Sequence, residues 1–150
     1  MRDEEVVQCE VRVKAKPETI FPFFIDPKKM VKWKGIEAVL DPRPGGVYSV
    51  NVTGRDKALG KYVEVTPFRR VVITWGWEGE GHPIPPGSTT VEITLHPEGD
   101  TTLVRLRHTG LTKAAQEQHE AGWVHYLGRL TTAAEGRNAG PDPMVGGGKM

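Results

Sequence analysis

Apolar and polar side chains alternate along much of the chain. In residues 4–14 one side of the extended chain carries Val7, Cys9 and Val11, while the side chains between them are polar. A period of two residues is typical of a β-strand that is buried on one face. Similar patterns, interrupted by turn residues, predict further strands over residues 36–41, 47–53, 60–66, 69–78, 89–96 and 102–108.

Short segments rich in Gly, Pro and Asp join these predicted strands. Residues 97–100 have the sequence Pro-Glu-Gly-Asp, which is typical of a tight hairpin turn. Residues 79–87 are longer and hold three prolines, so they are predicted to form a flexible loop. Because consecutive strands joined by short connections pair with their neighbours, the order of elements predicts an antiparallel meander.

Two short helices are predicted between the first strand and the meander. Pro17 followed by Glu18 is a favourable start, since proline suits the first helical position and an acid suits the first turn. Asp26 and Pro27 end this helix and begin a second one, which is predicted to extend through Met30 to Trp33.

The last predicted element is one long helix over residues 112–135. Thr112 is a good N-cap, and Gly136 is a suitable terminator. At 1.5 Å per residue, this helix would be roughly 30 to 35 Å long, which is enough to cross the concave face of the sheet. Its apolar stripe recurs at three- and four-residue steps, through Ala115, His119, Trp123, Tyr126, Leu130 and Ala133 or Ala134.

Length and composition fit one α+β domain followed by a tail. The chain has 150 residues, which is the size of a single domain. Residues 1–136 hold all the predicted elements. Residues 137–150 contain Gly146-Gly147-Gly148 and few side chains that would pack, so a disordered tail is predicted there.

Charge and cysteine content narrow the classes of partner. The 20 basic and 19 acidic residues leave a net charge of +1, which argues against nucleic acid or an anionic membrane as a partner. No apolar stretch is long enough to span a bilayer, and no apolar signal segment follows Met1, so a cytoplasmic location is expected. The single cysteine, Cys9, excludes an internal disulfide and a thiolate-rich metal site.

The candidate site consists of aromatic side chains on the inward faces of the predicted sheet and helix. Large flat side chains bury much area and can leave a cavity between them, and a glycine beside them leaves space. Simple filling of the core is an equally good interpretation for each aromatic, and for Trp75 it is the better one. Trp77, beside the 79–87 loop, is the better candidate for a gate. The predicted ligand-binding residues are Trp33, Tyr48, Trp75, Trp77, His108, Gly122, Trp123 and Tyr126.

Titratable residues offer weaker candidates for chemistry. His108 falls on the inward-facing side of its predicted strand, so it can hydrogen-bond a ligand or act as a base. A buried histidine with a structural role is the commoner case. Glu64 can be a catalytic acid or a salt-bridged surface acid, and its strand parity favours the surface. His119 and His125 are six positions apart on a helix, so their imidazoles diverge. We therefore predict no metal, no cofactor and no catalytic residue.

Several motifs together resemble the activator of heat-shock protein 90 ATPase homologue-like family, over about residues 5–135. This family is part of the START/birch-pollen-allergen superfamily, also called SRPBCC. The motifs are Pro17-Glu18-x-x-Phe21, Asp26-Pro27-x-Lys29-Met30-x-x-Trp33, Asp41-Pro42-Arg43-Pro44-Gly45-Gly46, Gly60-x-x-x-Glu64-Val65-x-Pro67, Arg70-x-Val72-x-Thr74-Trp75, Gly87-Ser88-Thr89 and His119-x-x-Gly122-Trp123-x-x-Tyr126-Leu127.

The resemblance implies the helix-grip (START-like) fold, a curved antiparallel sheet of about six or seven strands around a long C-terminal helix. It implies function less sharply, because the superfamily includes lipid carriers, hormone receptors, cyclases and hydrolases. In one position the chain departs from the pattern: Lys34 follows Trp33, where many relatives carry two aromatics. If the second aromatic of the relatives lines the mouth of a pocket, the mouth in this chain is more polar than theirs.

Three functions remain open at this point. The first is binding of a small apolar or amphipathic molecule between the sheet and the long helix. The second is a protein-interaction role as a cofactor of a chaperone, linked to the stress response. The third is an enzyme of the hydrolase or cyclase type acting on a pocket-bound ligand, which the sequence favours less. A homodimer and a monomer fit the sequence equally well.

Overall fold

Seven antiparallel strands form one curved sheet in the computed structural model, which describes residues 6–79 and 84–145. The strand order is β1-β7-β6-β5-β4-β3-β2, so β2 to β7 form the predicted meander and the first strand pairs with the last. The strands are β1 (Val6–Val13), β2 (Glu37–Leu40), β3 (Val47–Asn51), β4 (Lys57–Thr66), β5 (Arg70–Trp75), β6 (Thr89–Glu98) and β7 (Thr101–Thr109).

Two short helical segments follow β1, as predicted. The first comprises α1 (Pro17–Ile20) and a 3-10 turn, η1 (Phe21–Phe24). The second is α2 (Pro27–Met30), where the Asp26 carboxylate caps the helix by accepting a hydrogen bond from the Lys28 backbone amide at 2.9 Å. Regular helix ends at Met30, three residues before the predicted end, and the chain continues through turns to Trp33.

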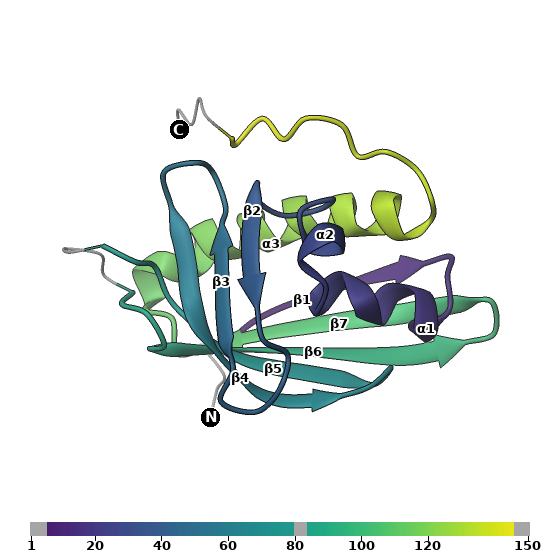
Figure 1. Cartoon of the computed structure of the whole chain (residues 1–150), viewed down its shortest axis with the longest axis horizontal. Coiled ribbons are helices and arrows are strands. Elements are labelled where there is room, and N and C mark those ends of the chain that lie inside the picture. Colours follow the sequence, from purple (N-terminus) through teal and green to yellow (C-terminus); the bar gives the residue numbers. More distant parts are fainter. Residues whose placement is uncertain (1–5, 80–83, 146–150) are drawn as a thin grey trace.

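The long helix α3 (Lys113–Ala134) lies across the concave side of the sheet, which curves around it (Figure 1). As predicted, the Thr112 hydroxyl caps the helix by accepting from the Ala115 amide at 3.2 Å. The buried positions fall in the second half of the helix, at Trp123, Tyr126, Leu127, Leu130 and Ala134. Ala115 and His119, in the first half, are only half-buried. The predicted α+β helix-grip fold is confirmed.

The predicted inward faces of the central strands are confirmed. Alternate side chains of β5, β6 and β7 are all buried, namely Val71, Ile73, Trp75, Val91, Ile93, Leu95, Val104, Leu106 and His108. The register places Val91 of β6 opposite both Ile73 and His108, so these three side chains share one row across the sheet. His108 therefore lies within the apolar face and not at its edge.

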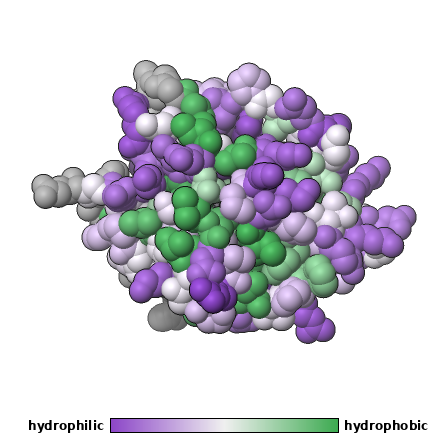
Figure 2. Space-filling model, viewed as in Figure 1, coloured by the Kyte–Doolittle hydropathy of each residue, from purple (hydrophilic) through white to green (hydrophobic). Residues whose placement is uncertain are grey.

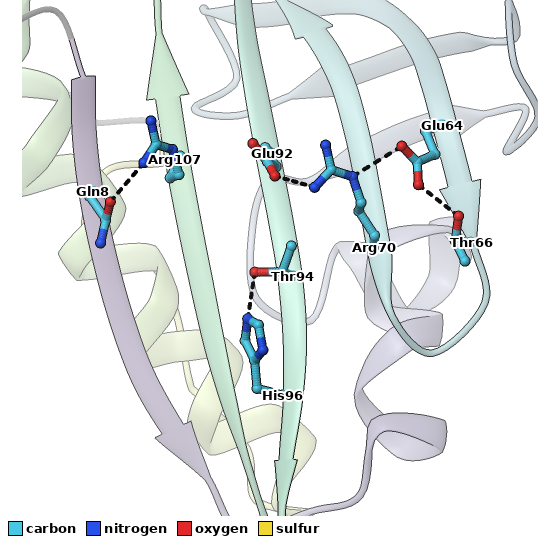
Figure 3. Close-up of polar contacts among 8 residues, drawn as sticks. All are labelled: Gln8, Glu64, Thr66, Arg70, Glu92, Thr94, His96 and Arg107. Carbon is cyan, nitrogen blue, oxygen red and sulfur yellow. Dashed lines mark hydrogen bonds and ion pairs between the residues drawn. The ribbon is translucent and has the colours of Figure 1, made fainter. Parts of the chain in front are cut away.

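The opposite, convex face of the sheet carries charged and polar side chains on β1 and on β4 to β7 (Figure 3). Arg70 of β5 lies between Glu64 of β4 and Glu92 of β6, and its Nε is 3.0 Å from a Glu64 carboxylate oxygen. Glu64 is thus the salt-bridged surface acid that its parity favoured. Exposed pairs of this kind contribute about 0–1 kcal/mol each, so they keep the face soluble and add little stability.

Strand β5 is shorter than predicted, because the ladder ends at Trp75. Trp77 instead forms an isolated antiparallel bridge with Ala58, and its amide donates to the Ile84 carbonyl at 2.8 Å. Gly76 permits this change of course: a Cβ built there would lie 1.7 Å from the Pro85 carbonyl oxygen. Residues 80–83 of the predicted 79–87 loop lie outside the described residues.

The segment after α3 returns along the helix (Figure 1). The guanidinium of Arg129 donates to the Gly140 carbonyl at 3.0 Å, and the Tyr126 hydroxyl donates to the Asp142 carboxylate at 2.8 Å. Residues 137–145 thus contact the domain, and residues 146–150 of the predicted disordered tail lie outside the described residues. No helix within the described part of the chain has the length and apolar character that a bilayer crossing needs.

The close approach at Gly76 leads to a test of stability. We expect Gly76→Ala to lower the free energy of unfolding by about 3 kcal/mol, because the methyl group and the Pro85 carbonyl cannot occupy the same space. Gly128→Ala in α3 is the matched control, since no atom lies within 4 Å of its new Cβ. The control should gain up to about 1 kcal/mol from helix propensity. Equal effects of the two changes in urea denaturation would contradict the assignment.

Candidate ligand-binding site

A cavity of about 430 Å³ lies between the first half of α3 and the sheet. This volume is within the range of small-molecule sites, roughly 300–1,000 Å³. Its apolar wall is formed by Val52, Trp75, Trp77, Ile84, Trp123 and Tyr126. On α3 the half-buried positions Ala115, His119 and Gly122 face it. The cavity exists because the second half of α3 packs closely on the sheet while the first half does not.

Five of the eight predicted site residues line this cavity, namely Trp75, Trp77, Gly122, Trp123 and Tyr126. Trp33 and Tyr48 lie elsewhere, beside a second void of about 10 Å³, which is too small for any ligand. The Trp33 indole donates to the Phe23 carbonyl at 3.0 Å, and Tyr48 packs edge-on against Tyr62. The strand pattern placed Tyr48 on the inward face, but neither this pattern nor the short helix predicted to end at Trp33 gave information on distance from the cavity.

His108, the eighth predicted residue, lies behind the cavity wall in a chain of hydrogen bonds. The Trp123 indole donates to His108 Nδ1 at 3.0 Å. The Thr89 hydroxyl donates to the Trp75 carbonyl at 2.7 Å and lies 2.8 Å from His108 Nε2. Since the only hydroxyl hydrogen is used on the carbonyl, Nε2 must carry the proton and donate to Thr89.

This arrangement requires a neutral His108. Burial is the main cause that lowers the pKa of His108 to about 3, and the charges of His119 and Lys34 act in the same direction. Both ring nitrogens are engaged, so neither is free to take a proton from a ligand. Of the two interpretations that the sequence left open, the geometry matches the structural one: His108 fixes the Trp75 and Trp123 side of the wall.

Lys34 is a cavity residue that the sequence analysis did not select. Its side chain is only 2% exposed, and its Nζ lies 4.0 Å from the ring centroid of Trp123. No carboxylate of residues 6–79 and 84–145 forms an ion pair with it. Burial lowers the pKa of Lys34 to about 7, so charged and neutral forms coexist near neutral pH.

The turn between α2 and β2 holds Lys34 in this position. Its backbone amide donates to the Met30 carbonyl at 2.9 Å, which continues the helical path of α2. Gly35 then reverses the chain at a φ of +88°, where a Cβ would lie 2.7 Å from the Asn51 carbonyl oxygen. The one signal in the sequence was the departure from the aromatic pair at this position.

His119 and Asp56 also line the cavity. His119 lies edge-on to Trp75, with ring centroids 5.3 Å apart, and its pKa is lowered to about 4 by burial and secondarily by the charge of Lys34. Asp56 accepts a hydrogen bond from the Thr53 hydroxyl at 3.1 Å. His125 points away from His119 to Asp142, at 2.9 Å. The described residues contain no cluster of three His, Cys, Asp or Glu side chains suited to a metal.

Trp75 carries an unusual polar atom. Its indole Nε1 is buried and has no hydrogen-bond partner among the described residues. A buried N–H without a partner costs about 1–3 kcal/mol, so native proteins keep few of them. The indoles of Trp33 and Trp123, by contrast, are both satisfied.

The curved sheet, the long helix across it and the cavity between them define a helix-grip protein of the START-like class. The family described as activator of Hsp90 ATPase homolog 1-like protein matches residues 14–135, and the chain belongs to this family. The resemblance seen in the sequence is thereby confirmed. No curated protein matches the chain.

Several solved structures share the fold. An AHSA1-like protein from Rhizobium etli is 48% identical, with 94% of this chain and 88% of that chain covered and a TM-score of 0.73. CalU16 from Micromonospora echinospora is 26% identical over 93% and 78% of the two chains, with a TM-score of 0.73. The Aha1 dimer from Colwellia psychrerythraea is 19% identical over 87% and 96%, with a TM-score of 0.74.

The buried Lys34 predicts a pH-dependent stability. The unfolded lysine has a pKa near 10.4, above the folded value of about 7. Between these values the unfolded chain binds the extra proton, so stability rises with pH from about 7 to 10. Lys34→Met removes this dependence. We expect the variant to be more stable than wild type at pH 7, on the order of 1–3 kcal/mol, with a smaller difference at pH 10.

Urea denaturation at both pH values measures this difference directly. Lys32→Met is the control, because Lys32 is an exposed lysine two residues away. The control should change stability equally little at pH 7 and pH 10. A Lys34→Met effect of the same size at both pH values would show that the lysine is not held in a low-dielectric site.

Proposed function

We propose that the chain binds a small hydrophobic or amphipathic molecule in the cavity between α3 and the sheet. The observation that carries this proposal is the cavity of about 430 Å³, whose wall includes three tryptophans and a tyrosine. Trp75, Trp77 and Trp123 are held in place by the surrounding packing and by the His108 hydrogen bonds. A rigid aromatic wall supports binding, because little side-chain entropy is lost when a ligand enters.

Gly122 gives the proposal a second support. A Cβ built on Gly122 meets no atom within 4 Å, so this position faces open space in the cavity. Glycine in a helix costs about 1 kcal/mol relative to alanine. An alanine would fit without a clash and improve the helix, yet the space is left empty. This is the pattern expected where a helix leaves room for a ligand.

An enzyme acting on the bound molecule is a weaker candidate. Both nitrogens of His108 are engaged in hydrogen bonds. His119, the histidine on the wall, has no hydrogen-bonded carboxylate partner among the described residues that would orient it as a base.

A protein-interaction role has one observation in its favour. Val39, Val47 and Val63 of β2, β3 and β4 are between 39% and 57% exposed, and apolar side chains gather on this face of the molecule (Figure 2). Strand β2 is also one of the two edge strands of the sheet. An exposed edge beside apolar side chains supports pairing with another chain, and the relative from Colwellia psychrerythraea is a dimer.

For the dimer we expect concentration-dependent association that Val39→Lys abolishes, because a charge on the edge strand opposes pairing. Light scattering during size-exclusion chromatography measures the mass of the particle. A monomer at every concentration would remove this second candidate. The cavity is on the other face, so binding of a small molecule should be the same in Val39→Lys and in wild type.

The binding proposal is tested by filling the space at Gly122. We expect Gly122→Leu to weaken binding of 1-pyrenebutanol at least about tenfold, because the new side chain occupies the cavity. Gly128→Leu is the matched control on the same helix, with an exposed glycine that also has open space at its Cβ. Both changes improve helix propensity by similar amounts, so they differ only in what the side chain fills.

Tryptophan fluorescence, with energy transfer to pyrene, provides the binding curve. Decanol serves as an aliphatic probe that competes with 1-pyrenebutanol if both enter the same space. The proposal would be contradicted if wild type gave no saturable fluorescence response to 1-pyrenebutanol, to decanol or to the corresponding acids, 1-pyrenebutyrate and decanoate. Equal binding by wild type and Gly122→Leu would place the ligand outside the cavity.

A further inference from the structure

We propose that the ligand of this cavity is an acid: an apolar, preferably flat molecule whose single carboxylate binds Lys34 at the closed end. The inference rests on the proposed function and specifies the chemistry that the site selects. Its basis is a buried lysine on the wall of a cavity lined by tryptophans, with no counter-ion among the described residues.

The position of Lys34 in the cavity is the first step. Lys34 lines the cavity, yet it is 2% exposed, whereas Met144 on the same lining is 40% exposed. The cavity therefore has a closed end at Lys34 and an open end near the segment after α3. A ligand group that reaches Lys34 is removed from water, where a charge-assisted hydrogen bond is strongest.

The balance of charge is the second step. Asp56 is the one carboxylate among the described lining residues, and it accepts from the Thr53 hydroxyl without forming an ion pair with Lys34. His108 and His119 face Lys34 as bases, and Tyr126 faces it as an aromatic ring, with 5.8 Å between Nζ and the ring centroid. The lining thus holds one lysine and one carboxylate that are not paired with each other, and Lys34 has no counter-ion among the described residues. An anionic ligand group supplies the missing charge.

Hydrogen bonding is the third step. The Lys34 ammonium lies 5.6 Å from the Trp75 ring centroid and 4.0 Å from that of Trp123, and it carries three N–H donors and no acceptor. A carboxylate oxygen can accept from these donors, while an ammonium or a hydrocarbon end of a ligand cannot. Hydrogen bonding and charge therefore point to the same group.

The remaining wall determines the body of the ligand. Trp75 and Trp123 both contribute rings beside the lysine, at 5.6 Å and 4.0 Å from Nζ. Aromatic faces pack best against flat apolar groups. The ammonium lies over the Trp123 ring in a cation–π contact, which stabilises the charge partially but leaves its hydrogen-bond donors available.

The experiment compares acids with alcohols of the same body. The probes are 1-pyrenebutyrate with 1-pyrenebutanol, and decanoate with decanol, titrated into wild type, Lys34→Met and Lys32→Met at pH 7. We expect wild type and Lys32→Met to bind each acid at least about tenfold more tightly than its alcohol, which corresponds to one charge-assisted hydrogen bond. In Lys34→Met the preference for each acid over its alcohol should fall below about threefold.

Each outcome separates the two proposals. If wild type binds the alcohols as tightly as the acids, the acid inference is wrong while the binding function stands. If wild type binds none of the four probes, the binding function itself fails. If Lys34→Met weakens acids and alcohols equally, with the circular dichroism spectrum of wild type, Lys34 shapes the cavity without selecting the acid. Retained preference in Lys34→Met also overturns the inference.

Discussion

The structure depends on one chain of hydrogen bonds that joins α3 to the concave face of the sheet. It runs from the Trp123 indole through the ring of His108 and the Thr89 hydroxyl to the Trp75 carbonyl. Each member is buried, so each bond is made in a low-dielectric environment, where breaking it leaves an unsatisfied polar group. The helix therefore has one fixed register and distance at this level. Beyond it, toward Ala115, α3 no longer packs closely, and the cavity opens.

The same chain of bonds explains why the cavity wall is ordered. Aromatic side chains around an empty space would otherwise close it by changing rotamers, since close packing is favourable. Trp123 is fixed by its bond to His108, and Trp75 is enclosed by rings of Trp77, His108 and His119. A neutral His108 is required for this order, because a protonated ring has no acceptor for the Trp123 indole. The cavity and its stability are consequently linked through one residue.

Lys34 and Trp75 show that the site is not arranged for maximum stability. A lysine held in an apolar wall and an indole N–H that has no partner among the described residues both lower the stability of the free protein. Proteins tolerate such costs at functional sites. The exposed valines on β2, β3 and β4 are a separate feature on the other face of the sheet, and they concern association of whole chains.

The sequence alone determined the strands, the helices and the inward faces, because these follow from local periodicity and from residues such as Thr112 and Pro17 at helix starts. It also identified five aromatic or glycine residues of the cavity, because knowing the strand or helix of each residue and the face it occupies was sufficient to select them. Three features depended on the tertiary structure. Trp33 and Tyr48 pack in the core away from the cavity, the pairing of Trp77 with Ala58 ends β5 early, and the turn at Gly35 buries Lys34. Each depends on contacts between residues far apart in the chain, about which the period of a single strand or helix carries no information.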